Sequence, residues 1–530
     1  MVAERPASSL PEVAMGVTTE GRESRRLRSM RLLFGAGLLT LISATLAVGG
    51  WWGFPVQDDT YMIRHLRMGG PERIVSEHAD RPVVGRLMAA GARIAGESRP
   101  FYIAVGVLSW LALTLEAAAL WARLFPEWAF AWPAVAIGIG APVVTMVQFT
   151  TLTTILPCVL PVVLVLASLL MLLNRPDAEG TLGIRLGAAL LAAAAAVFSE
   201  YALAAMAASV TFLFLRRRWR SALTLGAGVA VGYLVFRAIS MVSVRATTDP
   251  DVQIENVTRG PLGVPLKILG AAWECLIGAW GRAATGFSLD WDTRSSILAA
   301  TVALAAGLGA AAVGRRREGT NHPAKAGGRL AALVAAVLAG LVPTFVIRGF
   351  PLTRVFETRY FIPVLAFASC ATMGALMYAS RPRVAPWILF AVVFLGVDRL
   401  VLRAFEEKRL QESLDRFGRQ VRPLVATRVE DGLLILVSSR VPGVSPEETM
   451  AKATYRWPFP EAGLFWIVPP HVANNLFGPR AGCRSVRSLM LDKASIRWER
   501  PTENIRSLLW DASYSDTLDV EPYFRGCADH

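Results

Sequence analysis

Charged residues are scarce in this chain, and long apolar runs are abundant. Only 18% of its 530 residues are Asp, Glu, Lys or Arg, whereas 54% are hydrophobic. The apolar residues gather in repeated runs of about 20, the length that crosses a bilayer as a helix. A soluble domain of this size does not carry so many such runs. The composition therefore excludes that class and predicts an all-α polytopic membrane protein.

Motifs for nucleotide binding and for hydrolysis are also missing. The chain has no P-loop, Rossmann fingerprint, HExxH or nucleophile elbow, which argues against a nucleotide-driven pump. There are five cysteines and no CxxC or Cys/His spacing typical of zinc. Cys158, Cys275 and Cys370 fall in or beside apolar runs and are predicted to be packing residues. Cys483 and Cys527 lie in a polar tail and can pair if that tail is outside the cytoplasm.

The net charge of +14 is distributed in a way that indicates topology. Basic residues stand in short blocks between apolar runs, such as Arg216–Arg220 and Arg315–Arg317. Such blocks mark cytoplasmic loops and not a nucleic-acid-binding face. Placing them in the cytoplasm predicts about eleven transmembrane helices in the cell inner (plasma) membrane, with the N-terminus inside and the C-terminus outside.

The predicted organisation has three parts. Residues 1–30 form a disordered cytoplasmic tail, residues 31–404 form the transmembrane domain with an outer loop over 54–100, and residues 405–530 form a small α+β extracytoplasmic domain. The first apolar run, Leu32 to Trp52, reads as a signal peptide or as an uncleaved span. Its length and the paired Trp51 and Trp52 favour the span. The predicted spans cover about residues 32–52, 101–124, 128–147, runs ending near 173, 198 and 215, then 223–242, 296–313, 330–347, 361–378 and 386–402.

Four shorter patterns add local detail. Val83 to Ala95 is amphipathic, and Leu262 to Trp280 is apolar but interrupted by charges, which predicts an interfacial or re-entrant helix. Gly228 and Gly232 have the spacing of a close helix–helix contact. In the polar tail, residues 433–437 predict a strand.

An acidic pair, Asp58 and Asp59, follows the first apolar run within a few residues. A carboxylate at a membrane interface can act as a general base, or can hold a divalent cation such as Mg²⁺ or Mn²⁺ against a phosphate. The alternative is that the pair is only the solvated start of a loop.

Two further sets of charged residues follow the acidic pair along the chain. His78, Asp80 and Arg81 form an HxDRP segment that can orient a sugar, with Arg81 pairing an anion. The same residues are also compatible with a loop-to-helix junction in which Asp80 is the N-cap. Glu200 lies between two Ala-rich apolar runs, where an ionisable residue indicates function unless it is a solvated hairpin tip.

A basic outer loop precedes the run that begins near residue 361. It contains Arg348, Arg354, Arg359 and Tyr360. Several Arg at the outer mouth of a helical bundle suit a lipid-linked phosphate or pyrophosphate. Contacts with lipid headgroups, or with Glu357, are the alternative.

These features together resemble the GT-C superfamily of integral membrane glycosyltransferases. The likeness rests on a basic N-terminus, one span, and an outer loop with an acidic pair and an HxDRP-like segment. It also includes Glu200 between helices, and Arg359 and Tyr360 followed by Pro363 before a late helix. It covers about residues 30 to 400.

The resemblance implies a polyprenyl-phosphate-linked sugar as donor and a glycan, lipid or protein as acceptor. It implies that an Asp of the first outer loop is the base, which falls on Asp58 or Asp59 without choosing between them. Some relatives use a divalent metal and others do not. Two other functions remain open: an O-antigen-type polysaccharide polymerase or ligase, and a lipid or solute transporter. The near absence of charge at the helix centres argues against the transporter.

Overall fold

The structure is a computed structural model of the whole chain. It describes residues 35–47, 70–76, 78, 81–96, 98–140, 155–174, 182–243, 263–278, 280, 293–314, 323–348, 361–380, 384–402 and 404, and six strands between 433 and 510.

Within these ranges six helices are long and apolar enough to cross a membrane. They are α4 (Arg99–Leu124), η3 with α7 (Ile155–Val159 and Leu160–Leu173), α10 (Trp219–Ser243), α15 (Pro323–Arg348), α16 (Ile362–Ala379) and Ala385–Leu402. The other helices are Gly35–Ala47, α5 (Trp132–Gly140), α8 (Leu182–Phe198), α9 (Tyr201–Leu215), α12 with η4 (Gly263–Trp273 and Glu274–Gly278) and α14 (Thr293–Gly314). The helical class is confirmed, with six helices able to span a membrane by length and composition, while the count of eleven stays a prediction.

The start of the third predicted span is wrong by four residues. A 3-10 turn, Pro126–Ala131, precedes α5, and Trp128 has a non-helical backbone. Its carbonyl accepts a hydrogen bond from the indole N–H of Trp121 at 2.9 Å, and its ring stacks on Phe125. These contacts hold Trp128 in a turn, so the helix begins only at Trp132.

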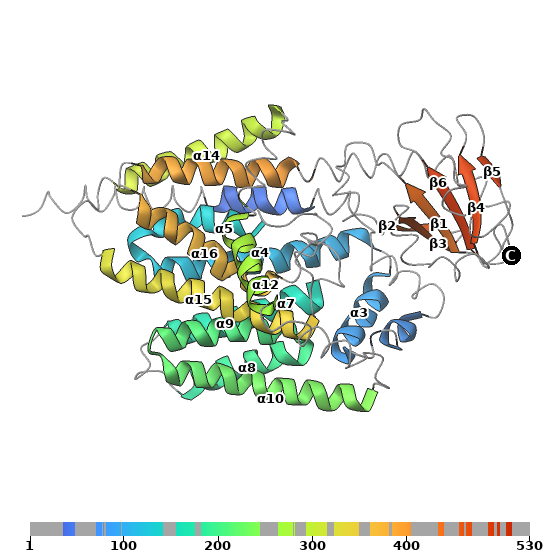
Figure 1. The fold of residues 1–530 in the computed structure, drawn as a ribbon, viewed down its shortest axis with the longest axis horizontal. Helices are drawn as coiled ribbons and strands as arrows, with labels where there is room; N and C mark the ends of the chain where they lie inside the picture. The colour runs from blue at the N-terminus through green and yellow to red at the C-terminus, as the bar shows by residue number, and fades with distance from the viewer. Residues whose placement is uncertain are drawn as a thin grey trace, which may run out of the picture.

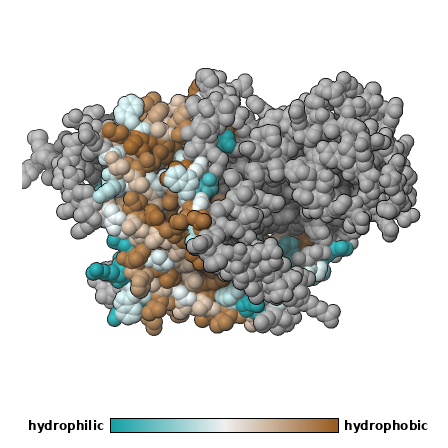
Figure 2. Space-filling view, viewed as in Figure 1, coloured by the Kyte–Doolittle hydropathy of each residue, from teal (hydrophilic) through white to brown (hydrophobic). Residues whose placement is uncertain are grey.

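The outer surface of the helices is apolar, as a lipid-facing surface must be. Hydrophobic residues cover much of the described helical surface in Figure 2. On α8, for example, Leu182, Leu186 and Leu190 recur every four residues and expose 56% or more of their area. Their spacing puts them on one side of the helix, away from the buried Ala188, Ala192, Ala195 and Ala196.

The helix α8 also packs against α10 through backbone contacts, at a partly exposed flank next to its exposed leucines. A Cβ added to Gly228 would overlap the carbonyl oxygen of Ala189, and one added to Gly232 would overlap that of Ala193. The pairs advance by four residues in the same direction, so α8 and α10 run parallel, and α9 connects them by running in the opposite direction. The predicted close contact of Gly228 and Gly232 is confirmed, and it uses small residues on both helices.

The helix α9 lies antiparallel to α15. Gly340 of α15 faces the carbonyl oxygen of Ala204, 3.0 Å from where its Cβ would be, near the start of α9. Past the end of α9, Arg216 is within electrostatic reach of Arg329 of α15. In Figure 1 the α8–α9 turn, the end of α15 and α3 lie toward the right of the bundle. The turn between α9 and α10 lies toward the left. The bundle therefore has two distinct ends, which the sequence predicts to be outer and cytoplasmic respectively.

A small satellite core lies at the end of the bundle that the sequence predicts to be outer. The helix α3 (Pro82–Ala95) covers the predicted amphipathic stretch and buries Val84, Met88 and Ala92, which recur at helical spacing. They pack with Ile74 of helix 70–76 and with Tyr102 near the start of α4. The apolar face of α3 thus packs against the bundle.

The C-terminal strands form one mixed sheet (Figure 1). Its order is β2-β3-β1-β6-β4-β5, with parallel central strands and antiparallel edges. Strand β1 covers the segment predicted at residues 433–437. The strands are β1 (Leu433–Ser438), β2 (Tyr455–Phe459), β3 (Gly463–Val468), β4 (Val486–Leu491), β5 (Ile496–Trp498) and β6 (Ile505–Trp510).

Candidate functional site

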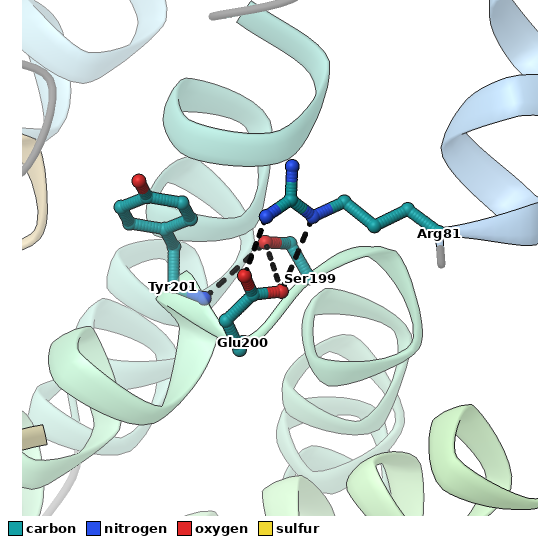
Figure 3. A network of polar contacts seen from close by, with 4 residues as sticks. All are labelled: Arg81, Ser199, Glu200 and Tyr201. Atoms are coloured by element: carbon teal, nitrogen blue, oxygen red, sulfur yellow. Dashed lines mark hydrogen bonds and ion pairs between the residues drawn. The ribbon is translucent and has the colours of Figure 1, made fainter. Parts of the chain in front are cut away.

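The structure brings together two of the predicted site residues, Arg81 and Glu200, although 119 positions separate them. Nη2 of Arg81 donates to Oε1 of Glu200 at 2.6 Å, and Nε donates to Oε2 at 3.3 Å (Figure 3). The side chains are 18% and 16% exposed. The guanidinium and the carboxylate therefore form a two-point, half-buried ion pair, the geometry in which Arg binds a carboxylate most specifically.

The α8–α9 turn positions the carboxylate of Glu200 and favours its negative charge. Glu200 is the N-cap residue of α9, where the peptide dipoles favour negative charge. The buried hydroxyl of Ser199 donates to Oε2 of Glu200 and accepts the backbone N–H of Tyr201, both at 3.3 Å. Glu200 is thus at a hairpin tip, as the simpler interpretation holds, but the tip is not solvated. The carboxylate of Glu200 is held in place by Ser199 and is paired with the guanidinium of Arg81.

Arg81 is itself fixed by its place in the fold. It is the N-cap residue of α3, with Pro82 at the first helical position, so the N-cap predicted at Asp80 is wrong by one residue. Its N–H donates to the carbonyl of His78 at 2.9 Å, and its carbonyl accepts from Gly85 at 2.9 Å. Pro82 fixes the backbone angle there and favours a helix start. The anion that Arg81 binds is the protein's own Glu200.

His78 serves the same junction. Its Nδ1 lies 3.0 Å from the carbonyl oxygen of Ile74, and its backbone N–H donates to the same oxygen. Gly85 approaches so closely that an added Cβ would lie 2.8 Å from the His78 Cβ. These contacts attach helix 70–76 to α3. A role for His78 in orienting a sugar stays a prediction.

The basic outer loop begins at the same end of the bundle. Arg348 is the last residue of α15, and α16 begins at Ile362 beside Gly340, where Val364 meets α15. The chain therefore leaves the bundle after α15, and returns to it at the start of α16, at the end where Glu200 lies. The other predicted site residues, Asp58, Asp59, Asp80, Arg354, Arg359 and Tyr360, lie outside the described residues.

We expect Arg81→Gln or Glu200→Gln to lower the free energy of unfolding by about 1 to 3 kcal/mol, because each change leaves a half-buried charge without its partner. The double variant should lose less than the sum of the two, since the remaining charge is then removed as well. Unfolding in mixed detergent micelles measures all three. Arg93 and Glu72 provide a matched pair that is 57% and 75% exposed, and Arg93→Gln should cost close to nothing. Equal losses at the two pairs would contradict a special role for Arg81 and Glu200.

Two acidic residues within the spans were missed from the sequence. Glu116 lies in α4, and its Oε2 is buried with no hydrogen-bond partner among the described residues. Asp398 lies in the helix Ala385–Leu402, is 1% exposed and accepts from the hydroxyl of Ser296 at 3.2 Å. The available signal was an ionisable residue inside an apolar run, which is costly in a membrane. Glu116 is therefore an exception to the predicted near absence of charge at the helix centres, whereas Asp398 lies four residues before the end of its helix.

Cysteine behaves as predicted. Cys158, Cys275 and Cys370 are all buried among packed helices, which confirms their interpretation as packing residues. In the described ranges no group of three or more His, Cys, Asp or Glu is arranged to hold a metal ion, and Asp58 and Asp59 fall outside the residues searched.

Comparison with known proteins yields no match to a family model, to a curated protein or to a solved structure.

Proposed function

We propose that this chain is a GT-C-like membrane glycosyltransferase, which moves a sugar from a polyprenyl-phosphate donor to an extracytoplasmic glycan, lipid or protein. The observation that supports it most is the ion pair of Arg81 with Glu200. It attaches the first outer loop to the end of a helical bundle. In a reaction whose donor is held at the membrane surface, the catalytic loop must be fixed there too.

The proposed base is Asp58 or Asp59. Its carboxylate takes the proton of the acceptor hydroxyl as that oxygen attacks the anomeric carbon of the sugar. The bond between that carbon and the phosphate oxygen then breaks, and the polyprenyl phosphate leaves. A divalent cation, where one is used, would be held by the same two carboxylates and would neutralise the phosphate.

The leaving phosphate gains negative charge, and the basic outer loop is proposed to stabilise it. Arg348, at the end of α15, and Arg354 and Arg359, which follow it in sequence, are the candidates. Arg81 is not assigned to this task, because Glu200 already binds its guanidinium. We propose for Arg81 and Glu200 a positioning role, which holds the first outer loop in its working conformation.

The finer topology belongs to the same proposal. We infer about eleven spans, an N-terminus in the cytoplasm, and a C-terminal α+β domain outside it. The Arg-rich turns and the outer loops then fall on opposite sides. In the structure the α9–α10 turn and the α8–α9 turn lie at opposite ends of α9, which supports that separation.

Sugar transfer by the purified full-length protein tests the proposal. The assay presents a panel of radiolabelled polyprenyl-phosphate sugars in detergent and measures label that leaves the lipid for a glycan, lipid or peptide acceptor. We expect transfer from at least one donor and none from the matching nucleotide sugars. Failure of every lipid-linked donor, with protein that unfolds cooperatively, would overturn the proposed function.

A transporter is the second candidate, and Glu116 is the observation that favours it. The residue lies eight positions before the end of α4, about 12 Å into the helix, where transporters place ionisable groups. Reconstituted vesicles that move a lipid-linked sugar across the bilayer without transferring it would favour this function over the first.

A further inference from the structure

The turn between α9 and α10 carries an unusual residue at a glycine position. The N–H of Arg218 donates to the carbonyl of Leu213 at 2.9 Å, and the N–H of Arg217 donates to that of Phe214 at 2.8 Å. These two bonds close the helix in the motif that normally has Gly in the left-handed position. Here the position is held by Arg217, with φ of 58°. It is the one non-glycine residue with positive φ in the described part of the chain.

An L-residue other than Gly is strained in that conformation, and such strain tends to persist where the side chain has a use. Gly would adopt this conformation without strain. The guanidinium is what Arg217 adds in exchange for the backbone strain. The side chain of Arg217 is exposed, as are those of Arg216 and Arg220. We call residues Arg216–Arg220 the basic turn.

Other arginines make the field around the basic turn strongly positive. Partial removal of the Arg216 guanidinium from water, and then the charges of Arg329 and Arg218, lower its pKa, although Arg stays protonated. Arg329 is partly neutralised by Glu127, whose Oε1 lies 2.7 Å from its Nη1. Arg218 donates to the carbonyl of Leu172 at the end of α7 at 3.1 Å. The neighbours Arg329 and Arg218 thus have protein partners. An anion beside Arg216 would offset the repulsion that these two charges exert on it.

An apolar surface adjoins this charge. Phe214 is 66% exposed, Leu215 51%, Trp219 53% and Leu223 63%. The guanidinium of Arg220 lies over the Trp219 ring, 5.2 Å from its centroid. Aromatic and Arg side chains side by side are typical of the boundary between headgroups and acyl chains. A ligand that fits both surfaces has an anionic head and long apolar chains.

We propose that the basic turn binds the phosphate headgroup of an anionic phospholipid through Arg216 and Arg217, with the acyl chains along Phe214 and Leu215. The site is separate from Arg81 and Glu200, since the 15 residues of α9 put about 22 Å between the two ends. It lies on the side that the sequence predicts to be cytoplasmic, where membranes carry anionic lipid. The proposal does not depend on the chemistry at the other end.

Lipid titration of the full-length protein in neutral detergent tests the proposal. Phosphatidylglycerol should raise the unfolding temperature of the parent, and phosphatidylcholine at the same concentration should raise it far less. For Arg217→Gly the apparent dissociation constant for phosphatidylglycerol should increase about fivefold. The same variant without lipid should unfold at the parental temperature or above it, because Gly relieves the backbone. A merely structural role for Arg217 would not separate these two effects.

Controls decide between the remaining outcomes. Arg86→Gln removes an exposed arginine from α3, at the other end of the bundle, and should leave the phosphatidylglycerol response unchanged. Arg216→Gln should weaken the response as Arg217→Gly does. Parental lipid affinity in both basic-turn variants would overturn the proposal. So would an equal response to inorganic phosphate, which would make the turn an anion site without lipid specificity.

Discussion

Asp58→Asn or Asp59→Asn is expected to lower the rate of sugar transfer by a factor of about 10² to 10⁴, the usual contribution of a general base. Asn keeps the size and polarity of Asp but cannot take a proton from the acceptor hydroxyl. The loss should appear in kcat, with the KM for the lipid-linked donor changed little, because the donor is held by other groups. The assay is single-turnover transfer from the donor identified in the panel.

The two variants are informative against each other. If one carboxylate is the base and its neighbour only supports it, one variant loses transfer and the other loses much less. If both hold a divalent cation, each variant should recover part of its rate at high concentrations of Mg²⁺ or Mn²⁺. Parental rates in both would show that the first outer loop is not the catalytic loop, even if the parent transfers sugar. Arg93→Gln, an exposed change in the same loop region, controls for indirect effects.

Gly232→Ala is expected to lower the free energy of unfolding by about 1 to 3 kcal/mol, although it adds a single methyl group. That methyl group would overlap the backbone carbonyl of Ala193, and a backbone cannot rotate away as a side chain can. The helices α8 and α10 would have to separate, and the neighbouring contact of Gly228 with Ala189 would be lost as well. Unfolding in mixed micelles, or thermal aggregation in detergent, measures the loss.

Gly226→Ala provides the control on the same helix. A Cβ at that position would meet only Cγ2 of Val210, at 3.9 Å, which is ordinary van der Waals contact. The change should be neutral or should stabilise the protein by up to about 1 kcal/mol, since Ala favours helix over Gly. Equal effects of Gly226→Ala and Gly232→Ala would indicate that backbone flexibility, and not the α8–α10 contact, determines the outcome.

Local patterns predicted the local structure well. The helix at 101–124 was read from its apolar composition and differs from α4 by two residues at one end. The amphipathic stretch near Val83 to Ala95 forms α3, because its apolar positions recur on one helical face. The pair Gly228 and Gly232 predicted a helix contact, because only small residues allow two backbones to approach so closely. In each case the cause lies within one segment.

What the sequence could not supply was the partner. No residue pattern near Glu200 predicts that its partner is Arg81, because the pair forms only when the first outer loop folds back on the α8–α9 turn. Trp128 was assigned to a helix by its apolar neighbourhood, but contacts with Trp121 and Phe125 hold it in a turn. A single acid such as Glu116 barely alters the mean hydropathy of a long apolar run, so the run alone does not reveal it. Tertiary contacts decide all three cases, and one-dimensional patterns do not contain them.

The short α8–α9 hairpin has a consequence for the membrane itself. With 17 and 15 residues, α8 and α9 are about 25 and 22 Å long, against a hydrocarbon core of about 30 Å. If both helices cross the bilayer, as we propose, local thinning of the bilayer around them relieves this hydrophobic mismatch. Lipids beside the hairpin would then have their headgroups drawn toward the midplane. If the donor is a polyprenyl phosphate, its phosphate would descend to the level of Glu200 and Arg81 without leaving the lipid phase.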